Sequence, residues 1–332
     1  GDPANGSGEN ASWTLDVGVS PVILGYNGQG VGTIANFGQD DTFAGAISSA
    51  GNTDGNGIGV FKYAPPSGFL ALCTANLPEP TIGPNSTTQA DDHFNTVLYT
   101  GGSSGQGITG VGFKPDWTWI KSRSHASSHV LTDSSRGVTK SLFSDTTGAE
   151  STLSGGVTAF GTDGFTLGTE GTVNTNTRTY VAWNWKANGG TATATISESG
   201  NNPAAVVQAN PTAGFSIVAY TGTQAAGTIA HGLGAVPKMM IFKNRAVDGN
   251  GWIVYHAGNT AAPETDFLFL NNTNATADNA NRFNDTAPTN SVFTLGADAN
   301  INDNGVACIG FIFAEVEGYS KFGSYTGNGN VD

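Results

Sequence analysis

Three short segments carry side chains of the types that bind metal ions. His125 and His129 are four residues apart, a spacing that on a helix would place both imidazoles on one face. Asp91-Asp92-His93 combines two carboxylates with an imidazole, and residues 298–303 offer the oxygens of Asp298, Asn300, Asn302 and Asp303. The histidine pair lacks the Glu of a zinc peptidase, and the last segment lacks the Gly and Glu that a calcium loop has at its sixth and twelfth positions. We expect polar loops here and predict no metal site.

The glycine-rich loop 101–112 (GGSSGQGITGVG) fits two catalytic patterns. Gly105-x-Gly107-x-x-Gly110 has the spacing of a dinucleotide-binding loop, and Gly101-x-Ser103-x-Gly105 that of a nucleophile elbow. Both patterns need a helix directly after the loop, whereas this loop leads into a tryptophan-rich strand pattern. The sequence therefore predicts a flexible connection, no catalytic or cofactor-binding residue, no cofactor, and a protein that is not an enzyme.

Four tryptophans recur at every second position in two segments, which places each pair on one face of a strand. Flat aromatic rings on a sheet can stack on sugar rings, so a carbohydrate platform is one interpretation. Equivalent positions later in the chain keep apolar volume but not the indole, as expected of core positions. We predict core packing and leave ligand-binding residues unassigned. The tryptophans and their counterparts are Trp117 and Met239, Trp119 and Ile241, Trp183 and Phe311, and Trp185 and Phe313.

An internal repeat, of which these counterparts are a part, organises the chain. Three segments end in Tyr-Thr-Gly, at 94–101, 215–222 and 319–327. The first two are followed by further matching segments, 110–123 with 232–245 and 164–185 with 292–313. The alignment pairs Lys121 with Lys243 and Arg123 with Arg245, which indicates either a repeated ion pair or a repeated subunit contact.

Short period-two segments separated by Gly, Asn and Asp turns predict an all-β protein of tandem, jelly-roll-like β-sandwich domains. Turns are expected at 162–164, 169–171 and 303–305, and only residues 133–143 have a weak helical pattern. The predicted parts are a non-repeated set of strands at 1–75, a proline-containing linker at 76–93, a first repeat at 94–190, a second linker at 191–213 with a short strand at 206–209, a second repeat at 214–318, and the first strand of a further repeat at 319–332.

Composition and charge argue against several classes of partner. Gly accounts for 48 of 332 residues, charged residues for only 12%, and the net charge is −13. This charge would repel a phosphate backbone and an anionic membrane. No apolar segment approaches the ~20 residues of a membrane helix, so we predict no nucleic-acid and no membrane partner. Cys73 and Cys308 lie in different predicted domains, and we expect two free buried thiols.

Two further features concern processing. The chain opens without Met or a signal peptide and closes inside a repeat, so we expect it to be a piece of a longer protein. In a chain rich in Asn, Ser and Thr several glycosylation sequons arise by chance. They lie at Asn5, Asn10, Asn85, Asn271, Asn274 and Asn284.

Long strings of the sequence resemble structural proteins of marine and freshwater tailed phages. VGTIANFGQDDTFAG (31–45) and FKYAPPSGFLAL (61–72) look like the end of a SPRY or concanavalin A-like lectin domain of such proteins. The segments that resemble the repeated domain following it are FNTVLYTG, GVGFKPDWTWIKSR, LTDSSRG, TDGFTLG, YVAWNWKANGG and, in the next copy, GTIAHGLGAVPKMMIFKNR. The resemblance implies that residues 1–75 are the C-terminal part of a lectin-like β-sandwich. It carries no ligand residue over to this chain.

The resemblance also implies a virion component on the particle surface, as a tail fibre, appendage or capsid decoration. We expect a spacer and adhesion module that binds itself, as a trimer or a lattice, other virion proteins, and cell-surface carbohydrate. A bacterial extracellular adhesin or filament subunit is one alternative. A carbohydrate-binding appendage of a polysaccharide-degrading enzyme is another.

Overall fold

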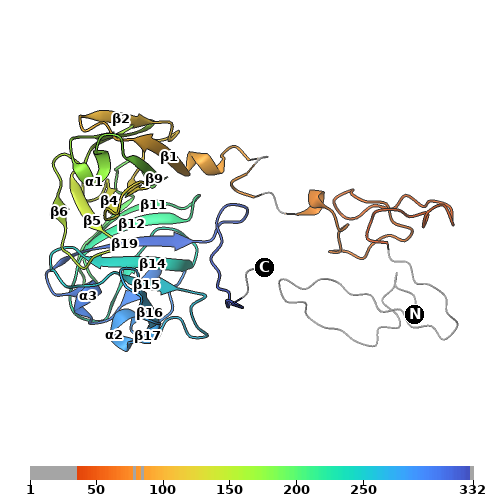
Figure 1. The fold of residues 1–332 in the computed structure, drawn as a ribbon. Helices are drawn as coiled ribbons and strands as arrows, with labels where there is room; N and C mark the ends of the chain where they lie inside the picture. Colours follow the sequence, from red (N-terminus) through yellow and green to blue (C-terminus); the bar gives the residue numbers. More distant parts are fainter. Residues whose placement is uncertain (1–35, 78–79, 84–85, 330–332) are drawn as a thin grey trace. The chain divides into compact units, whose positions relative to one another are not determined.

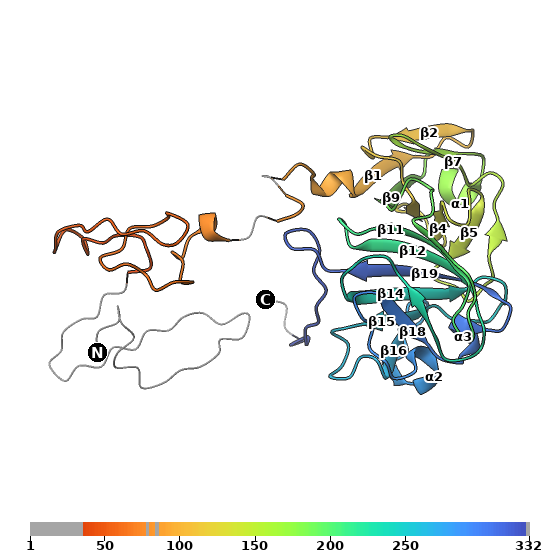
Figure 2. The ribbon, with the colours of Figure 1, turned by 180° about the vertical axis from the view of Figure 1, so that it is seen from behind.

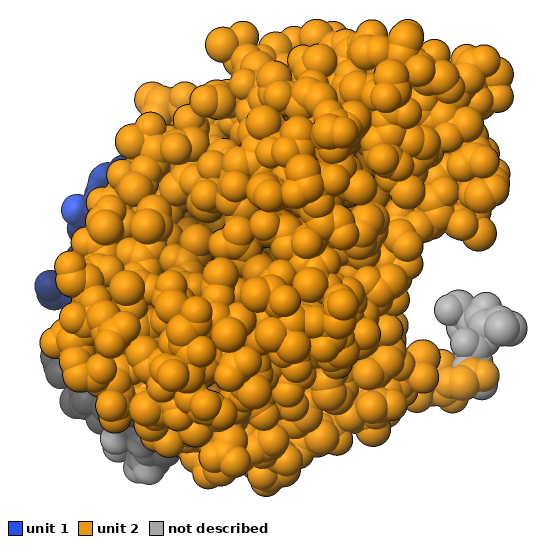
Figure 3. All heavy atoms as spheres, turned by 90° about the vertical axis from the view of Figure 1, so that its left-hand side faces the viewer, with its two compact units in different colours: residues 1–79 blue, residues 80–332 orange. Residues whose placement is uncertain are grey.

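The computed structural model describes residues 36–77, 80–83 and 86–329, and the sequons at Asn5, Asn10 and Asn85 lie outside this part. The chain divides into two compact units, residues 1–79 and 80–332. The atoms of the second unit form one continuous body in a space-filling view (Figure 3). No helix in the described part is long and apolar enough to cross a membrane.

In the first unit, residues 36–77 form loops and turns held by side chains. The Asp54 carboxylate accepts hydrogen bonds from the backbone N–H of Ala71 (2.8 Å) and from the Asn76 amide (2.7 Å), which ties the middle of this segment to its end. Asn52 and Phe61 form one isolated bridge, and a 3-10 helix, η2, spans Thr74–Asn76. Residues 36–77 contain no β-strand, and the remainder of the lectin-like end predicted for 1–75 lies outside the described residues.

The first repeat is a β-sandwich of a six-stranded main sheet and a three-stranded small sheet (Figure 1). Apolar residues of both sheets, among them Ile120, Val130 and Phe165, are buried between them. Across the main sheet the order is β1 (Phe94–Thr100), β9 (Thr179–Trp185), β3 (Trp117–Ser122), β4 (Val130–Asp133), β5 (Lys140–Phe143) and β6 (Ser151–Thr152); the small sheet is β2 (Gln106–Thr109), β8 (Gly164–Leu167) and β7 (Val157–Gly161).

The second repeat has the same plan, with an eight-stranded main sheet and a two-stranded small sheet. Its core includes Phe242, Phe283 and Phe293. Across the main sheet the order is β10 (Ala194–Ile196), β11 (Ala205–Asn210), β12 (Phe215–Thr221), β19 (Ala307–Ala314), β14 (Pro237–Asn244), β15 (Ile253–His256), β16 (Asp266–Phe269) and β17 (Ala277–Asp278); the small sheet is β13 (Gly227–Ala230) and β18 (Val292–Leu295).

These sheets confirm the predicted all-β fold class, and strand register reproduces the sequence alignment. Trp119 lies opposite Trp183 in the first repeat, and Ile241 lies opposite Phe311 in the second. The glycine of the first two Tyr-Thr-Gly segments is required by close packing, whereas a Cβ at Gly327 in the third would meet no atom within 4 Å. A Cβ at Gly101 would lie 2.2 Å from the Thr175 carbonyl oxygen, and one at Gly222 would lie 2.3 Å from that of Asp303.

In both repeats a buried asparagine links the loop that follows the Tyr-Thr-Gly segment to the end of a small-sheet strand. The Asn174 amide donates to the carbonyl oxygens of Ser104 and Gly168 (both 2.6 Å) and accepts from Gly102 N (2.8 Å). Asn302 makes the matching bonds in the second repeat, to the carbonyl oxygens of Ala225 (2.8 Å) and Gly296 (2.7 Å) and from Thr223 N (2.9 Å). Each ends a one-turn helix, α1 (Gly171–Asn174) and α3 (Ala299–Asn302).

One local prediction is confirmed and several need revision. Residues 133–143 contain a single helical turn, as the weak pattern suggested: Gly137 N donates to the Asp133 carbonyl (3.1 Å), and the chain then enters β5. Short helices that the sequence did not predict occur at α1, α3 and α2 (Ala280–Phe283). The predicted linker 191–213 contributes β10 and β11 to the second main sheet, and residues 76–93 carry a second 3-10 helix, η3 (Ala90–Asp92). Described residues 321–329 pair with no strand.

Candidate functional site: the interface between the repeats

The outer faces of the two main sheets pack against each other and bury a third apolar cluster. In both ribbon views the strands of the first repeat lie against the sheet formed by β11, β12, β19 and β14 (Figures 1 and 2). Trp117 is at the centre. Its ring stacks on Phe311, with centroids 4.1 Å apart, and on Trp185, at 4.3 Å. Trp117 is 1% exposed and Phe311 is fully buried.

The predicted core packing is therefore confirmed for Trp117, but the core lies between the repeats. Alternation along β3 turns Ile120 toward the sandwich interior and Trp117 toward the other repeat. Trp119 and Trp185 pack against the interface cluster and remain partly exposed. Trp183 touches Trp119 edge to face, with centroids 6.4 Å apart. Partly exposed indoles at a domain interface leave room for ligands.

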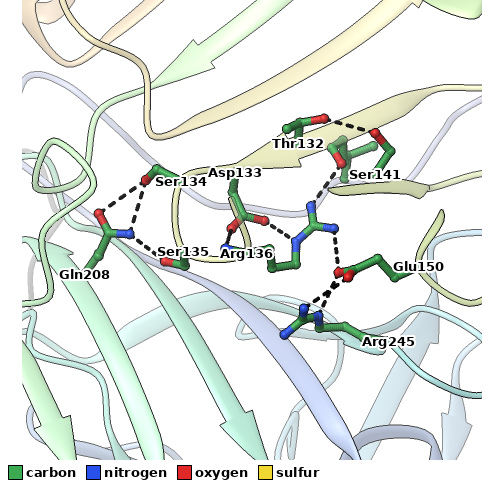
Figure 4. A network of polar contacts seen from close by, with 10 residues as sticks. Thr132, Asp133, Ser134, Ser135, Arg136, Ser141, Glu150, Gln208 and Arg245 are labelled. Atoms are coloured by element: carbon green, nitrogen blue, oxygen red, sulfur yellow. Dashed lines mark hydrogen bonds and ion pairs between the residues drawn. The ribbon is translucent and has the colours of Figure 1, made fainter. Parts of the chain in front are cut away.

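A network of charged side chains joins the repeats on one side of the interface (Figure 4). Glu150 accepts from Arg245 Nε (2.8 Å) and Nη2 (3.2 Å), and Arg136 Nη1 lies 3.2 Å from the same carboxylate. Arg136 also pairs with buried Asp133. Burial alone would raise the pKa of Glu150, but the hydrogen bonds from Arg245 and the charges of Arg136 and Arg245 outweigh it and hold that pKa below its usual value. Glu150 is thus ionised between two arginines that come from different repeats.

The Lys243 ammonium is the second cross-repeat contact on this side. It is fully buried and donates to the carbonyl oxygens of Thr147 (3.2 Å) and Asn250 (2.7 Å). Burial lowers the pKa of Lys243 to about 8, against the opposing effect of the Asp248 carboxylate. Residues 147–150 are further held by backbone bonds, such as Glu150 N to Arg245 O (2.7 Å).

Gln208 on β11 adds neutral bonds between the repeats. Its amide donates to the hydroxyls of Ser134 (3.1 Å) and Ser135 (2.6 Å), and its carbonyl accepts from Gly190 N (3.0 Å). Figure 4 shows Gln208 beside the turn that also carries Arg136.

Two cavities open at the interface. One of about 390 Å³ is lined mainly by aromatic residues, including Trp185, Phe313 and Phe322, with residues 319–322 along one wall. The other, of about 350 Å³, has more polar walls that include His129, Asp145 and Asn272. Trp119 lines both, and each volume falls in the range of small-molecule sites.

The predicted lysine and arginine pairs behave differently in the two repeats. Lys243 and Arg245 contact the first repeat, as described above. Lys121 donates instead to the Ser127 carbonyl in its own repeat, and Arg123 is exposed and forms no ion pair within the described part of the chain. The retained positions therefore serve a contact between repeats on one side only.

The candidate metal ligands do not converge. His125 contacts Ser127, while His129 accepts a bond from Trp119. Asp92 caps η3, and His93 is buried between Thr88 and Asn210. The Asp298 carboxylate caps α3 and pairs with Arg282. Across residues 36–77, 80–83 and 86–329, no group of three or more His, Cys, Asp or Glu side chains could hold a metal ion.

The remaining sequence candidates also have structural partners. The loop 101–112, predicted to be a flexible connection, contains strand β2 and leads into strand β3 rather than a helix, and the Ser103 hydroxyl accepts from Asn176 N (2.7 Å). Cys308 is a free buried thiol, whereas Cys73, expected to be buried, is exposed because it lies on a surface bend before η2. Among the described sequons, Asn274 and Asn284 are exposed and Asn271 is partly buried.

The fold and the interface define a class of all-β proteins made of two fused β-sandwich repeats. Residues 89–332 match the family described as Domain of unknown function (DUF7483), and the chain belongs to this family. The matched region includes both repeats. No curated protein and no solved structure matches the chain.

We predict that Trp117→Ala lowers the free energy of unfolding by about 3–5 kcal/mol, because it leaves a cavity between the sheets. Trp117→Phe should cost less than half of this. Its ring retains the stacking, and it removes the Trp117 Nε1 donor, which is buried without a partner among the described residues. Urea unfolding checks both variants. Equal losses for Trp117→Ala and for Trp183→Ala would contradict a central role for Trp117.

Glu150→Gln is expected to lower the free energy of unfolding by about 1–3 kcal/mol, because two arginines lose their ionic acceptor. Arg245→Met should have a similar effect. The equivalent change in the other repeat, Arg123→Met, is the matched control and should stay within about 0.5 kcal/mol of the wild type. Similar losses of unfolding free energy for Arg245→Met and Arg123→Met would contradict an ionic contact between the repeats on one side only.

Lys243 predicts a pH dependence of stability. The unfolded chain keeps this lysine charged up to its ordinary pKa of 10.5, whereas the folded chain does so only up to about 8. Between these values the unfolded chain binds more protons, so the free energy of unfolding rises with pH. The raised pKa of buried Cys308 opposes this above its ordinary value of 9.0, so the comparison uses Lys243→Met. Relative to that variant, the wild type should gain stability from pH 8 toward pH 9, and a flat difference would contradict the prediction.

Proposed function

We propose that this chain is a structural protein of a tailed-phage virion, where it acts as a spacer and adhesion module on the particle surface. It would belong to a tail fibre, an appendage or a capsid decoration and would face the extracellular medium. The observation that carries this proposal is the fusion of two repeated sandwiches through a buried aromatic layer. A spacer must keep its shape under load, and a fused pair resists bending better than two sandwiches on a flexible linker.

Self-association is part of the proposal. The main sheets end in β1, β6, β10 and β17, each of which has one neighbour within the described residues. Leu98 on β1 is 62% exposed. Unpaired edges and exposed apolar side chains favour contacts with further copies or with other virion proteins, as a trimer in a fibre or as a lattice on a capsid.

Two other functions remain candidates. A bacterial adhesin or filament subunit would use the same rigid repeats, and neighbouring genes for portal and terminase proteins would favour the phage instead. A carbohydrate-binding appendage of a polysaccharide-degrading enzyme is favoured by the partly exposed Trp119 in a cavity that also has polar side chains in its walls. It requires a catalytic domain in the same gene.

Electron microscopy of the native source tests the proposal. A gold-labelled antibody against residues 94–318 should mark capsids or tails, and its position separates decoration from adhesion. Label on cell-bound or free filaments without virus particles would overturn the virion assignment. Binding of glycans alone, without particle labelling, would support the enzyme appendage.

A further inference from the structure

The interface has two sides that the repeat makes equivalent, and only one of them is closed. Strand register identifies the equivalent residues. Ile120 and Phe242 occupy the same position in the two repeats, and their partners on the next strand are Val130 and Ile253. The residues just before these partners, His129 and Trp252, are therefore equivalent. On the closed side, Trp252 is fully buried and its Nε1 donates to the Phe143 carbonyl (2.9 Å) of the other repeat. A few residues after Phe143 in the first repeat, Thr147 accepts a hydrogen bond from Lys243 and Glu150 accepts one from Arg245.

On the other side the smaller His129 takes the place of the indole. The loop 270–276 corresponds to 144–150, because β15 and β16 pair as β4 and β5 do. It makes no hydrogen bond to the first repeat in the part of the chain that the structure describes, and Thr276 stands where Glu150 stands in the closed half. Between the repeats lies the cavity of about 350 Å³, here called the Trp119 groove. Its walls include Trp119, His129, Asp145, Leu270, Asn271 and Asn272.

The polar groups of the Trp119 groove have defined hydrogen-bonding roles. Trp119 Nε1 donates to His129 Nδ1 (2.8 Å), so the proton of the neutral imidazole is on Nε2. Burial, and then the charge of Lys121, lower the pKa of His129, and the Asp145 carboxylate opposes this shift only in part. Because the pKa is lowered, the imidazole is neutral at pH 7. His129 Nε2–H therefore remains as a donor with no partner among the described residues.

The loops 144–150 and 270–276 add both hydrogen-bond acceptors and donors to the groove. Asp145 uses Oδ1 to accept from His129 N (3.1 Å), and its exposed carboxylate keeps acceptor capacity. The side-chain oxygens of Asn271 and Asn272 accept from Trp252 N (2.8 Å) and Asn274 N (2.9 Å). Each of these bonds leaves an amide NH₂ as a donor.

We propose that the Trp119 groove binds a neutral saccharide. A sugar ring has an apolar C–H face that fits an indole, and hydroxyls that both donate and accept, as the lining of the groove requires. The Asp145 carboxylate and the uncharged His129 disfavour an anionic ligand, and the hydrogen-bonding groups of His129, Asp145 and the two asparagines would be left without partners by a wholly apolar one. The inference deepens the adhesive function proposed above and rests on it, since adhesion to glycans needs such a site.

The test uses the full chain. Labelled protein is applied to a microarray of neutral, sialylated and sulfated glycans, with immobilised peptides alongside, and the affinity for the strongest neutral glycan is measured by calorimetry. We expect binding to neutral glycans, weakened about tenfold or more by His129→Phe, which retains ring volume but removes both the Nε2–H donor and the Nδ1 acceptor of Trp119 Nε1. His125→Phe, four residues away and outside the groove, is the matched control and should bind as the wild type does.

A second variant guards against misfolding. Leu270→Trp fills the groove from a residue that is already 37% exposed, so it should abolish binding while the thermal unfolding midpoint stays unchanged. The proposal would be overturned if the protein bound only anionic glycans, only peptides, or no probe at all. Neutral-glycan binding that survives Leu270→Trp would overturn it as well. Particle labelling by electron microscopy does not depend on any of these outcomes, so failure of the groove and failure of the virion assignment are distinguishable.

Discussion

The stacking of Trp117 between Trp185 and Phe311 is the contact on which the rest of this structure depends. Each repeat buries one face of its main sheet in its own sandwich and presents a second apolar face on the other side. Such a face is too apolar to remain in water, and packing the two together removes both from solvent. The ionic network of Glu150 with its two arginines and the hydrogen bonds of Gln208 lie around this layer. They fix how the sheets sit on each other, whereas burial of the aromatic rings supplies most of the stabilisation.

The same arrangement explains how two similar repeats acquire different surroundings. The backbone positions of Arg123 and Arg245 are equivalent, yet only Arg245 meets a carboxylate. His129 and Trp252 are equivalent too, and the difference in their volume leaves one half of the interface open. A repeated fold thus combines one half that is closed by cross-repeat hydrogen bonds with one accessible half, which suits a proposed role in both spacing and adhesion.

Much of the fold could be predicted from sequence because its signals are local or repeated. Period-two apolar residues predicted the strands, and the Tyr-Thr-Gly segments predicted the repeats. The interface could not be predicted, because alternation shows that Trp117 and Ile120 face opposite ways but not that both faces are buried. Asn174 and Glu150 were missed since their partners are distant: Ser104 and Arg245 lie 70 and 95 residues away. The one-turn helices are too short to have a periodic pattern.

The central claim is that the aromatic layer fuses the two repeats into one cooperative body. Amide hydrogen exchange measured by mass spectrometry tests it most directly, because it reports the free energy of opening separately for β9 in the first repeat and β12 in the second. The account predicts a shared value for both strands, and an equal decrease in both when Trp117 is replaced by Ala. Independent values, with only β9 responding to the substitution, would show that the repeats are separate domains that merely touch.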